Sequence, residues 1–330
     1  MKIVAPISRA DEVGVLAEAG ADELYCGLVP KTWTERFNNS GANRRIFGNL
    51  KSEEELARAA DAARAAGVRL SLVMNAQNYT GEQLDYLVAF AARFEALGGH
   101  ALIVGDLFLL EVLVEAGLGL RLHLSSVASC RNSEAIAWYR DLGVDRVILP
   151  RDVTRREVAR MLRRSPGVEL EAFVLNDGCI YEEGVCHSIH LPGALGGPIC
   201  LDGYRQEVRR DDGVPLEPAE RNRFVEHEED YRRWLWYRTG CGFSTTDQGL
   251  PYGPCGLCAL PGFHAAGLTA IKIAGREAAT ERKRASVAMV RDIRDRVVAE
   301  EPEAAVREVA VSMRGDRAHC DHGYMCYYPR

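Results

Sequence analysis

Short apolar runs alternate with amphipathic segments along the chain, a pattern that is typical of strands alternating with helices. The apolar runs predict strands over residues 2–6, 23–27, 70–75, 101–105, 120–125, 146–150, 169–175 and 270–274. The intervening segments predict helices over residues 8–19, 81–97, 106–116, 132–142, 154–164, 261–266 and 276–299, with one more that begins after Ser52. Ser52 and Glu55 have the spacing of a capping box, which marks that helix start.

Strand–helix units in this number and order predict a TIM-like (β/α)8 barrel, because each right-handed crossover returns the chain parallel to the previous strand. A doubly wound sheet is the alternative. It is disfavoured because Ala5-Pro6-Ile7-Ser8, and not a Gly-x-Gly-x-x-Gly turn, follows the first strand. The predicted barrel spans residues 1–300 and includes a large cysteine-rich insertion over residues 176–260, after the seventh strand. Residues 301–330 are predicted to form a C-terminal tail.

The charge balance limits the classes of partner. Lys and Arg number 41 against 47 Asp and Glu, a net charge of −6, which argues against a nucleic-acid-binding surface. The chain has no apolar run of the roughly 18 residues that a membrane span needs. Its first residues lack the apolar core of a signal peptide, so we expect a cytoplasmic protein.

The cysteines are clustered. Most of the ten lie between residues 179 and 258, and two more lie near the C-terminus. Disulfides are disfavoured in a reducing cytosol, which leaves metal binding. Zinc sites usually show paired short spacings, whereas this chain has one Cys-x-x-Cys, at Cys255 and Cys258. The longer, uneven spacings of the other cysteines favour an iron–sulfur cluster, with zinc as the alternative.

Polar residues at the predicted strand ends are the candidates for the active site, because parallel barrels place their sites there. Arg151 and Arg276 follow the sixth and eighth strands, and two guanidinium groups over one mouth would bind carboxylates. The other candidates are Asn75 and Ser125 for substrate binding and Asn176, Asp177 and His187 for proton transfer.

Several motifs resemble the U32 peptidase (collagenase-like) family. They are Glu171-Ala-Phe173-Val-Leu-Asn-Asp-Gly-Cys179, Gly184-Val-Cys186-His-Ser188, Gly20-Ala-Asp-Glu-Leu-Tyr25-Cys-Gly27, His123-Leu-Ser125 and Ala266-Gly-Leu-Thr-Ala-Ile-Lys272-Ile-Ala-Gly275-Arg276. The resemblance implies an oxygen-independent hydroxylase, a barrel that carries a 4Fe-4S cluster. Some members hydroxylate a ubiquinone precursor as heterodimers of two family members, and others modify RNA, with prephenate as oxygen donor.

The chain is most similar to the ubiquinone-biosynthesis subunit, which implies that Cys179, Cys186, Cys200 and Cys241 hold the cluster. Cys255, Cys258, Cys320 and Cys326 are additional and could build a second metal site, or the last two could belong to a mobile tail. The predicted function is oxygen-independent hydroxylation, or a related oxidation, of a small organic substrate. One alternative is a peptidase, with Cys179 or Cys186 as nucleophile and His187 as base. Another is a non-catalytic iron–sulfur partner subunit of a heterodimeric hydroxylase.

Overall fold

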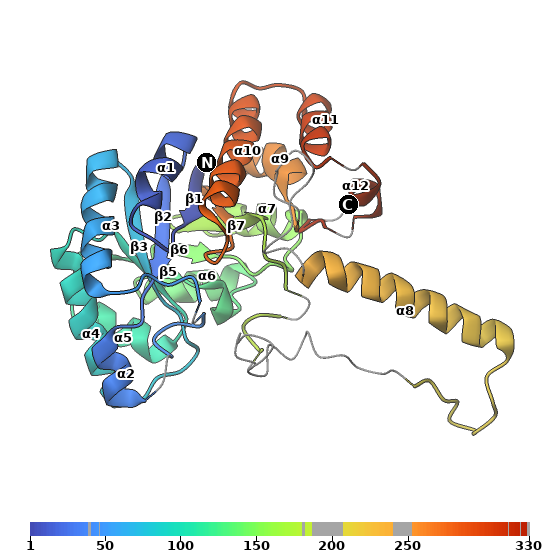
Figure 1. Ribbon diagram of the computed structural model, residues 1–330, viewed down its shortest axis with the longest axis horizontal. Helices are drawn as coiled ribbons and strands as arrows, with labels where there is room; N and C mark the ends of the chain where they lie inside the picture. The colour runs from blue at the N-terminus through green and yellow to red at the C-terminus, as the bar shows by residue number, and fades with distance from the viewer. Residues whose placement is uncertain are drawn as a thin grey trace.

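The computed structural model describes residues 1–38, 41–45, 47–179, 182–186, 207–239, 253–315, 317–323 and 325–328. Eight parallel strands close into a barrel in the order of the chain, with helices around it, so the predicted TIM-like fold is confirmed (Figure 1). The barrel closes where β8 pairs with β1, with Ile3 opposite Ile271. Among the described residues, no helix is both long and apolar enough to cross a membrane.

The strands lie close to their predicted positions. They are β1 (Lys2–Pro6), β2 (Glu23–Gly27), β3 (Arg69–Met74), β4 (Ala101–Val104), β5 (Arg121–Leu124), β6 (Arg146–Ile148), β7 (Glu169–Leu175) and β8 (Ala270–Ile273). The helices are α1 (Glu12–Ala19), α2 (Lys31–Phe37), α3 (Glu53–Ala66), α4 (Gly81–Ala96), α5 (Leu107–Glu115), α6 (Ser133–Asp141), α7 (Arg155–Arg164), α8 (Pro218–Thr239), α9 (Leu260–Ala265), α10 (Thr280–Val298), α11 (Glu303–Met313) and α12 (Arg317–His322), with 3-10 turns η1 (Ser126–Ala128) and η5 (Leu257–Ala259).

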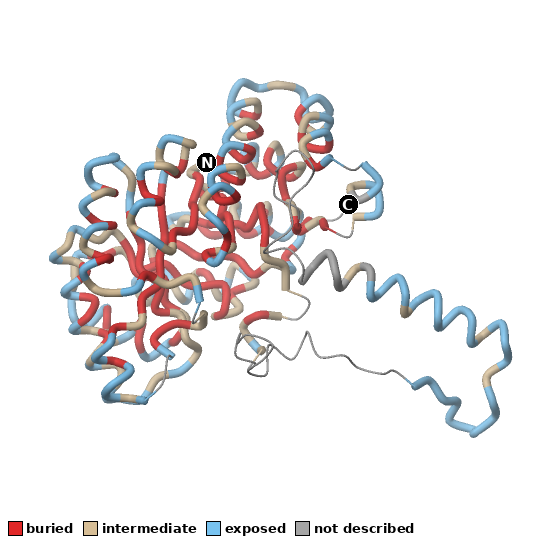
Figure 2. The backbone as a smooth tube through the Cα atoms, in the orientation of Figure 1, coloured by how far each residue is buried: buried red, intermediate tan, exposed pale blue. Residues whose placement is uncertain are grey.

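The apolar core lies between the outer face of the barrel and the inner faces of its helices. Figure 2 shows burial concentrated in the strands and in the helix faces that cover them. The β-strands are buried on both faces, which explains why they read as continuous apolar runs in the sequence. By contrast, α8 extends away from the barrel and most of its described residues are exposed (Figures 1 and 2).

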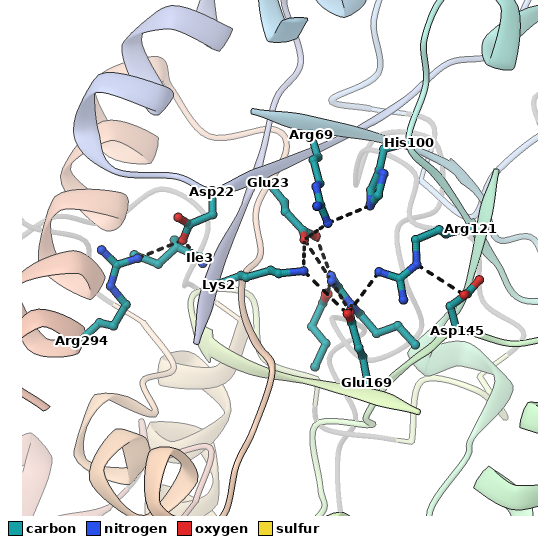
Figure 3. Close-up of polar contacts among 12 residues, drawn as sticks. Lys2, Ile3, Asp22, Glu23, Arg69, His100, Arg121, Asp145, Glu169 and Arg294 are labelled. Carbon is teal, nitrogen blue, oxygen red and sulfur yellow. Dashed lines mark hydrogen bonds and ion pairs between the residues drawn. The ribbon is translucent and has the colours of Figure 1, made fainter. Parts of the chain in front are cut away.

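A network of charged side chains fills the barrel at the N-terminal ends of its strands (Figure 3). Its centre is the fully buried Arg146, which donates from Nη1 to Glu23 Oε2 (2.6 Å) and to Glu171 Oε2 (3.0 Å), and from Nε to Glu169 Oε2 (2.7 Å). Burial would raise the pKa of Glu23, but the hydrogen bond and charge of Arg146 outweigh it and lower that pKa to about 2. In parallel barrels this end usually serves stability.

The structure corrects the sequence prediction in two loops. Residues 29–51, predicted as one polar loop, contain α2, which is anchored by the fully buried Trp33. Trp33 packs edge-on against Tyr79 (6.2 Å between ring centroids) and Tyr86 (5.4 Å), so tertiary contacts stabilise a helix with little apolar pattern of its own. The insertion contains α8, for which the sequence analysis predicted no element.

The segment predicted as a C-terminal tail contains α11 and α12, and its last described residues pack on the barrel. Tyr327 and Tyr328 are buried, and Tyr328 donates its hydroxyl to the carbonyl of Phe173 in β7 (2.9 Å). Cys255 and Cys326 form an isolated parallel bridge, and Cys255 also bridges to Leu175. The C-terminal segment therefore extends the pairing that begins at the end of β7.

Candidate active site

A cavity of about 130 Å³ opens at the C-terminal ends of the barrel strands. It is lined by side chains from β2, β3, β4, β7 and β8 and from the loops that follow β2, β3, β5, β6, β7 and β8. Five cationic side chains face two carboxylates on its wall: Arg44, Arg45, Arg151, Lys272 and Arg276 against Asp177 and Glu183. The excess of positive charge makes this cavity suited to an anionic ligand.

Arg276 was predicted from its position after β8, and the structure places it on the cavity wall. It is buried and donates to two amide oxygens, Asn49 Oδ1 (2.9 Å) and Asn43 Oδ1 (3.4 Å). These neutral acceptors orient the guanidinium without neutralising its charge. Burial lowers the pKa of Arg276 from its usual value, although a guanidinium remains charged at any physiological pH.

Arg151, the second predicted arginine, also lines the cavity. Its Nε donates to the backbone carbonyl of Asp177 (2.9 Å), its Nη1 forms an ion pair with Glu183, and its guanidinium lies 3.8 Å from the centre of the Phe173 ring. Three different kinds of contact therefore fix the position of this guanidinium.

The end of β7 carries an unusual backbone. Asn176 and Asp177 have φ of 62° and 52°, a left-handed conformation that non-glycine residues seldom adopt. Asp177 points to the cavity, where Oδ2 accepts from Arg45 Nη2 (2.5 Å). Asn176 turns away from it and donates to Ser286 Oγ (3.1 Å), so these two of the three predicted proton-transfer residues point in different directions. Strained residues of this kind are common at functional sites.

The first two cysteines of the predicted ligand set, Cys179 and Cys186, line the same cavity. Arg44 lies beside them: burial lowers its pKa, and the neighbouring Cys186 and Cys179 act in the opposite direction. The Arg44 guanidinium also donates to the backbone carbonyls of Glu183 (2.5 Å) and Cys186 (3.3 Å). Arg44 therefore places a positive charge beside these two cysteines.

Residues 182–186, which carry Cys186, are held over the cavity by the loops after β3 and β5. Gln77, after β3, donates to the carbonyl of Gly184, and Ser129, after β5, donates to Glu182 Oε2 (2.9 Å). Arg131 adds an ion pair with Glu182 (3.2 Å). A methyl group on Gly184 would meet Ser129 Oγ, so the segment needs glycine there for this close approach.

The inner end of the cavity is formed by Lys272 and Tyr25. Lys272 Nζ forms a buried ion pair with Glu171 Oε1 (2.7 Å) and lies 4.0 Å from the centre of the Tyr25 ring. Burial lowers the pKa of Lys272, while the charge and hydrogen bond of Glu171 act against it. Burial also raises the pKa of Tyr25, so its phenol stays protonated and donates to the carbonyl of Ile273 (3.0 Å).

The remaining predicted residues divide into two groups. Asn75 and Ser125 line the cavity and hydrogen-bond to each other (3.1 Å). His187, Cys200 and Cys241 lie outside the described residues. Their assigned roles stay predictions.

Sequence reasoning missed Arg44, Arg45 and Glu183. All three lie in loops, and only their neighbours in the fold bring them to the cavity. The sole signal was the pair of adjacent arginines in a segment that the sequence analysis treated as a loop.

A second group of cysteines gathers elsewhere. Cys255, Cys258, Cys320 and Cys326 line another cavity, of about 600 Å³, between η5, α11, α12 and the last described residues. Burial raises the pKa of Cys320 to about 12, and the three other thiols act in the same direction. In the part of the chain that the structure describes, no three His, Cys, Asp or Glu side chains meet closely enough to bind one metal ion.

Fold and site together define a (β/α)8-barrel protein with a cationic, cysteine-containing cavity at the catalytic end. The chain belongs to peptidase family U32, whose family model matches residues 8–330. Over 56% of its length it is 26% identical to tRNA hydroxylation protein P1 of Bacillus subtilis, and the match covers 41% of that protein. Over 51% of its length it is 26% identical to tRNA hydroxylation protein P of Escherichia coli, covering 34% of that protein.

The chain therefore matches less than half the length of these curated relatives. Among solved structures, that of the U32 peptidase Mk0906 is 17% identical, with a TM-score of 0.43. The similarity covers 53% of this chain and 68% of that one.

Proposed function

We propose that this chain is an iron–sulfur enzyme that hydroxylates an anionic organic substrate without using dioxygen. The observation that carries the proposal is that Cys179 and Cys186 line the same cavity as Arg151 and Arg276. The names of the two relatives, which are tRNA hydroxylation proteins, support hydroxylation as the reaction class.

The residues around Cys179 and Cys186 fit an iron–sulfur cluster. Both thiols reach one cavity, and the guanidinium of Arg44 beside them would offset part of the negative charge of cluster-bound thiolates. The predicted third and fourth ligands are Cys200 and Cys241. A bound cluster would supply one-electron oxidation and reduction next to the substrate. Cys179 and Cys186 could not act as peptidase nucleophiles while they hold a cluster, which is why we prefer the hydroxylase to the peptidase.

The cavity residues would bind and orient the substrate. Arg276, whose charge is not neutralised by its amide partners, would pair with one carboxylate, and Arg151 would pair with a second. Prephenate, the oxygen donor that the family resemblance suggests, carries two carboxylates and fits this arrangement. Asp177 is held as an acceptor by Arg45 at 2.5 Å, in a position to accept a proton from a hydroxyl in the cavity.

Iron binding tests whether Cys179 and Cys186 hold a cluster. The protein would be reconstituted anaerobically with iron and sulfide, and iron, sulfide and zinc would be counted for the wild type and for Cys179→Ser/Cys186→Ser. We expect the double variant to lose about four irons per chain. Unchanged iron, or zinc alone in the wild type, would remove the redox mechanism. Thiol alkylation before and after iron chelation would distinguish the peptidase from the hydroxylase. In a peptidase, the nucleophilic Cys179 or Cys186 would react even in the iron-loaded protein.

Ligand binding tests whether Arg276 binds an anionic ligand. Calorimetry would compare prephenate binding by the wild type, by Arg276→Gln and by Arg140→Gln, a control at an exposed arginine that pairs with its neighbour Asp141. We expect Arg276→Gln to weaken binding by about tenfold or more, the loss of roughly 1.5–3 kcal/mol that a charge-assisted hydrogen bond contributes. Equal affinities for all three proteins would contradict an anion site at Arg276.

Transfer RNA is the second candidate substrate, and the names of the relatives favour it. The guanidinium groups of the cavity could bind a phosphate as well as a carboxylate. Anaerobic incubation of the iron-loaded protein with prephenate and either tRNA or an aromatic quinone precursor, followed by mass spectrometry, distinguishes the two. Co-purification with a second barrel protein, and no turnover by this chain alone, would instead favour the partner-subunit alternative.

A further inference from the structure

The four cysteines of the second cavity come from three separate parts of the chain. Cys255 precedes η5, Cys258 lies within it, Cys320 belongs to α12 and Cys326 follows. The backbone brings them together: the amide of Cys255 donates to the carbonyl of Met325 (2.6 Å), and the amide of Tyr327 donates to the carbonyl of Cys255 (2.9 Å). Sheet-type pairing therefore fixes Cys255 beside Cys326.

The charge around these thiols suits an anionic metal centre. Arg155, Arg307 and Arg314 line the same cavity, and Glu303 and Asp321 are its carboxylates. Arg314 is buried and is anchored by donation to the carbonyl of Gly253 (2.7 Å). Four thiolates leave a bound metal centre with net negative charge, and the three guanidinium groups would offset it.

The size of the cavity favours a cluster over a single ion. Zinc binds sulfur at about 2.3 Å, so its four thiolates would have to lie within about 4 Å of one another. No described group of three metal-binding side chains is gathered in this way, and the four cysteines line a cavity of about 600 Å³ that has room for a cluster. A cubane cluster takes its four thiolates at separate corners and so accepts ligands that are farther apart.

We propose that Cys255, Cys258, Cys320 and Cys326 bind a second cubane iron–sulfur cluster, separate from the candidate active site. Its role is structural. Metal–thiolate bonds contribute directly to folding free energy, and here they would hold α12 and the residues after it against the barrel. The proposal does not depend on the hydroxylase function, because none of these cysteines lines the cavity that holds Cys179 and Cys186.

Tyr327 connects this second site to the first. Its hydroxyl donates to the backbone carbonyls of Asn176 and Asp177, the strained residues at the end of β7. The amide of Asn176 in turn donates to the carbonyl of Pro254 (2.8 Å), next to Cys255. Loss of the second cluster would therefore loosen the backbone that positions Asp177.

The test counts iron and sulfide in anaerobically reconstituted protein. We expect Cys320→Ser/Cys326→Ser to lose about four irons relative to the wild type, and Cys130→Ala, a buried cysteine in neither cavity, to lose none. Unchanged iron in Cys320→Ser/Cys326→Ser would overturn the proposal. The proposal would also be overturned if the wild type held one zinc ion that Cys320→Ser/Cys326→Ser lacked.

The two sites fail in distinguishable ways. If only the active-site cluster is wrong, Cys179→Ser/Cys186→Ser keeps all its iron while Cys320→Ser/Cys326→Ser still loses its share. Because a variant can misfold, a second measurement uses unaltered protein: alkylation with peptide mapping before and after iron chelation. Protection of Cys255, Cys258, Cys320 and Cys326 only in the iron-loaded state supports the second cluster, and equal labelling in both states overturns it.

Discussion

The charge network at the N-terminal end of the barrel should stabilise the fold through its central arginine, Arg146. Arg146 is fully buried and contacts three glutamates, so Arg146→Met would leave Glu23 and Glu171 in the barrel without their central cation. Removing one partner of a buried ion pair costs about 3–5 kcal/mol. The pKa of Glu23 gives a similar value for this loss of stability. A Glu23 pKa lowered from 4.5 to about 2 corresponds to about 3 kcal/mol of stability at neutral pH.

The stability that Glu23 contributes should decrease as the pH falls. Because the pKa of Glu23 is lower in the folded protein than in the unfolded chain, its contribution is complete above about pH 4.5 and is lost as the pH falls toward 2. At pH 3 about half of it remains. The wild type and Arg146→Met should therefore differ by about 3–5 kcal/mol at pH 7, and by about 2 kcal/mol less at pH 3.

The assay is urea unfolding of metal-free protein, followed by far-ultraviolet circular dichroism at both pH values. Arg140→Met is the matched control, because Arg140 is exposed and its pair with Asp141 should contribute at most about 1 kcal/mol. A wild type and Arg146→Met of equal stability at pH 7 would refute the reasoning. So would a difference between them that stays the same from pH 7 to pH 3, since it would then arise from packing and not from charge.

Three further predictions concern the mouth of the barrel. Gly27→Ala places a methyl group against Arg276 and should weaken prephenate binding about tenfold by calorimetry; Gly14→Ala, which has open space, is its control, and unchanged affinity would contradict it. Tyr327→Phe loses the hydroxyl that donates to the end of β7 and should lower the free energy of urea unfolding by about 1 kcal/mol, whereas no change would show that the bond contributes nothing. Gly184→Ala should displace the segment with Cys186 and reduce bound iron, and full iron content would show that the segment tolerates a side chain.

The sequence predicted the barrel because all eight strands are buried on both faces and therefore stand out as apolar runs between helices. It also placed Arg151, Arg276, Asn75 and Ser125 on one cavity, because the direction of a parallel barrel fixes where its strands end. These successes follow from topology, which local pattern determines well.

The sequence did not predict the position of side chains that tertiary contacts determine. Arg44 and Arg45 reach the cavity because the loop after β3 holds the segment that carries them: the Arg44 amide donates to Asn75 Oδ1 (3.2 Å) and the Tyr79 hydroxyl donates to the carbonyl of Ala42 (2.9 Å). Nothing in the local pattern indicates these contacts. Asn176 was predicted to take part in proton transfer, and the left-handed turn at the end of β7 directs its side chain toward α10. A strand end predicts the neighbourhood of a residue but not the direction of its side chain.

The contact from Tyr327 to the end of β7 has a consequence for biosynthesis. A ribosome makes the chain from the N-terminus, so the strands and the cysteines at positions 179 and 186 emerge well before the residue that clamps Asn176 and Asp177. The nascent barrel therefore has an incomplete entrance until residue 327 has been made. Any step that requires the finished entrance would therefore have to wait until that residue has joined the folded barrel.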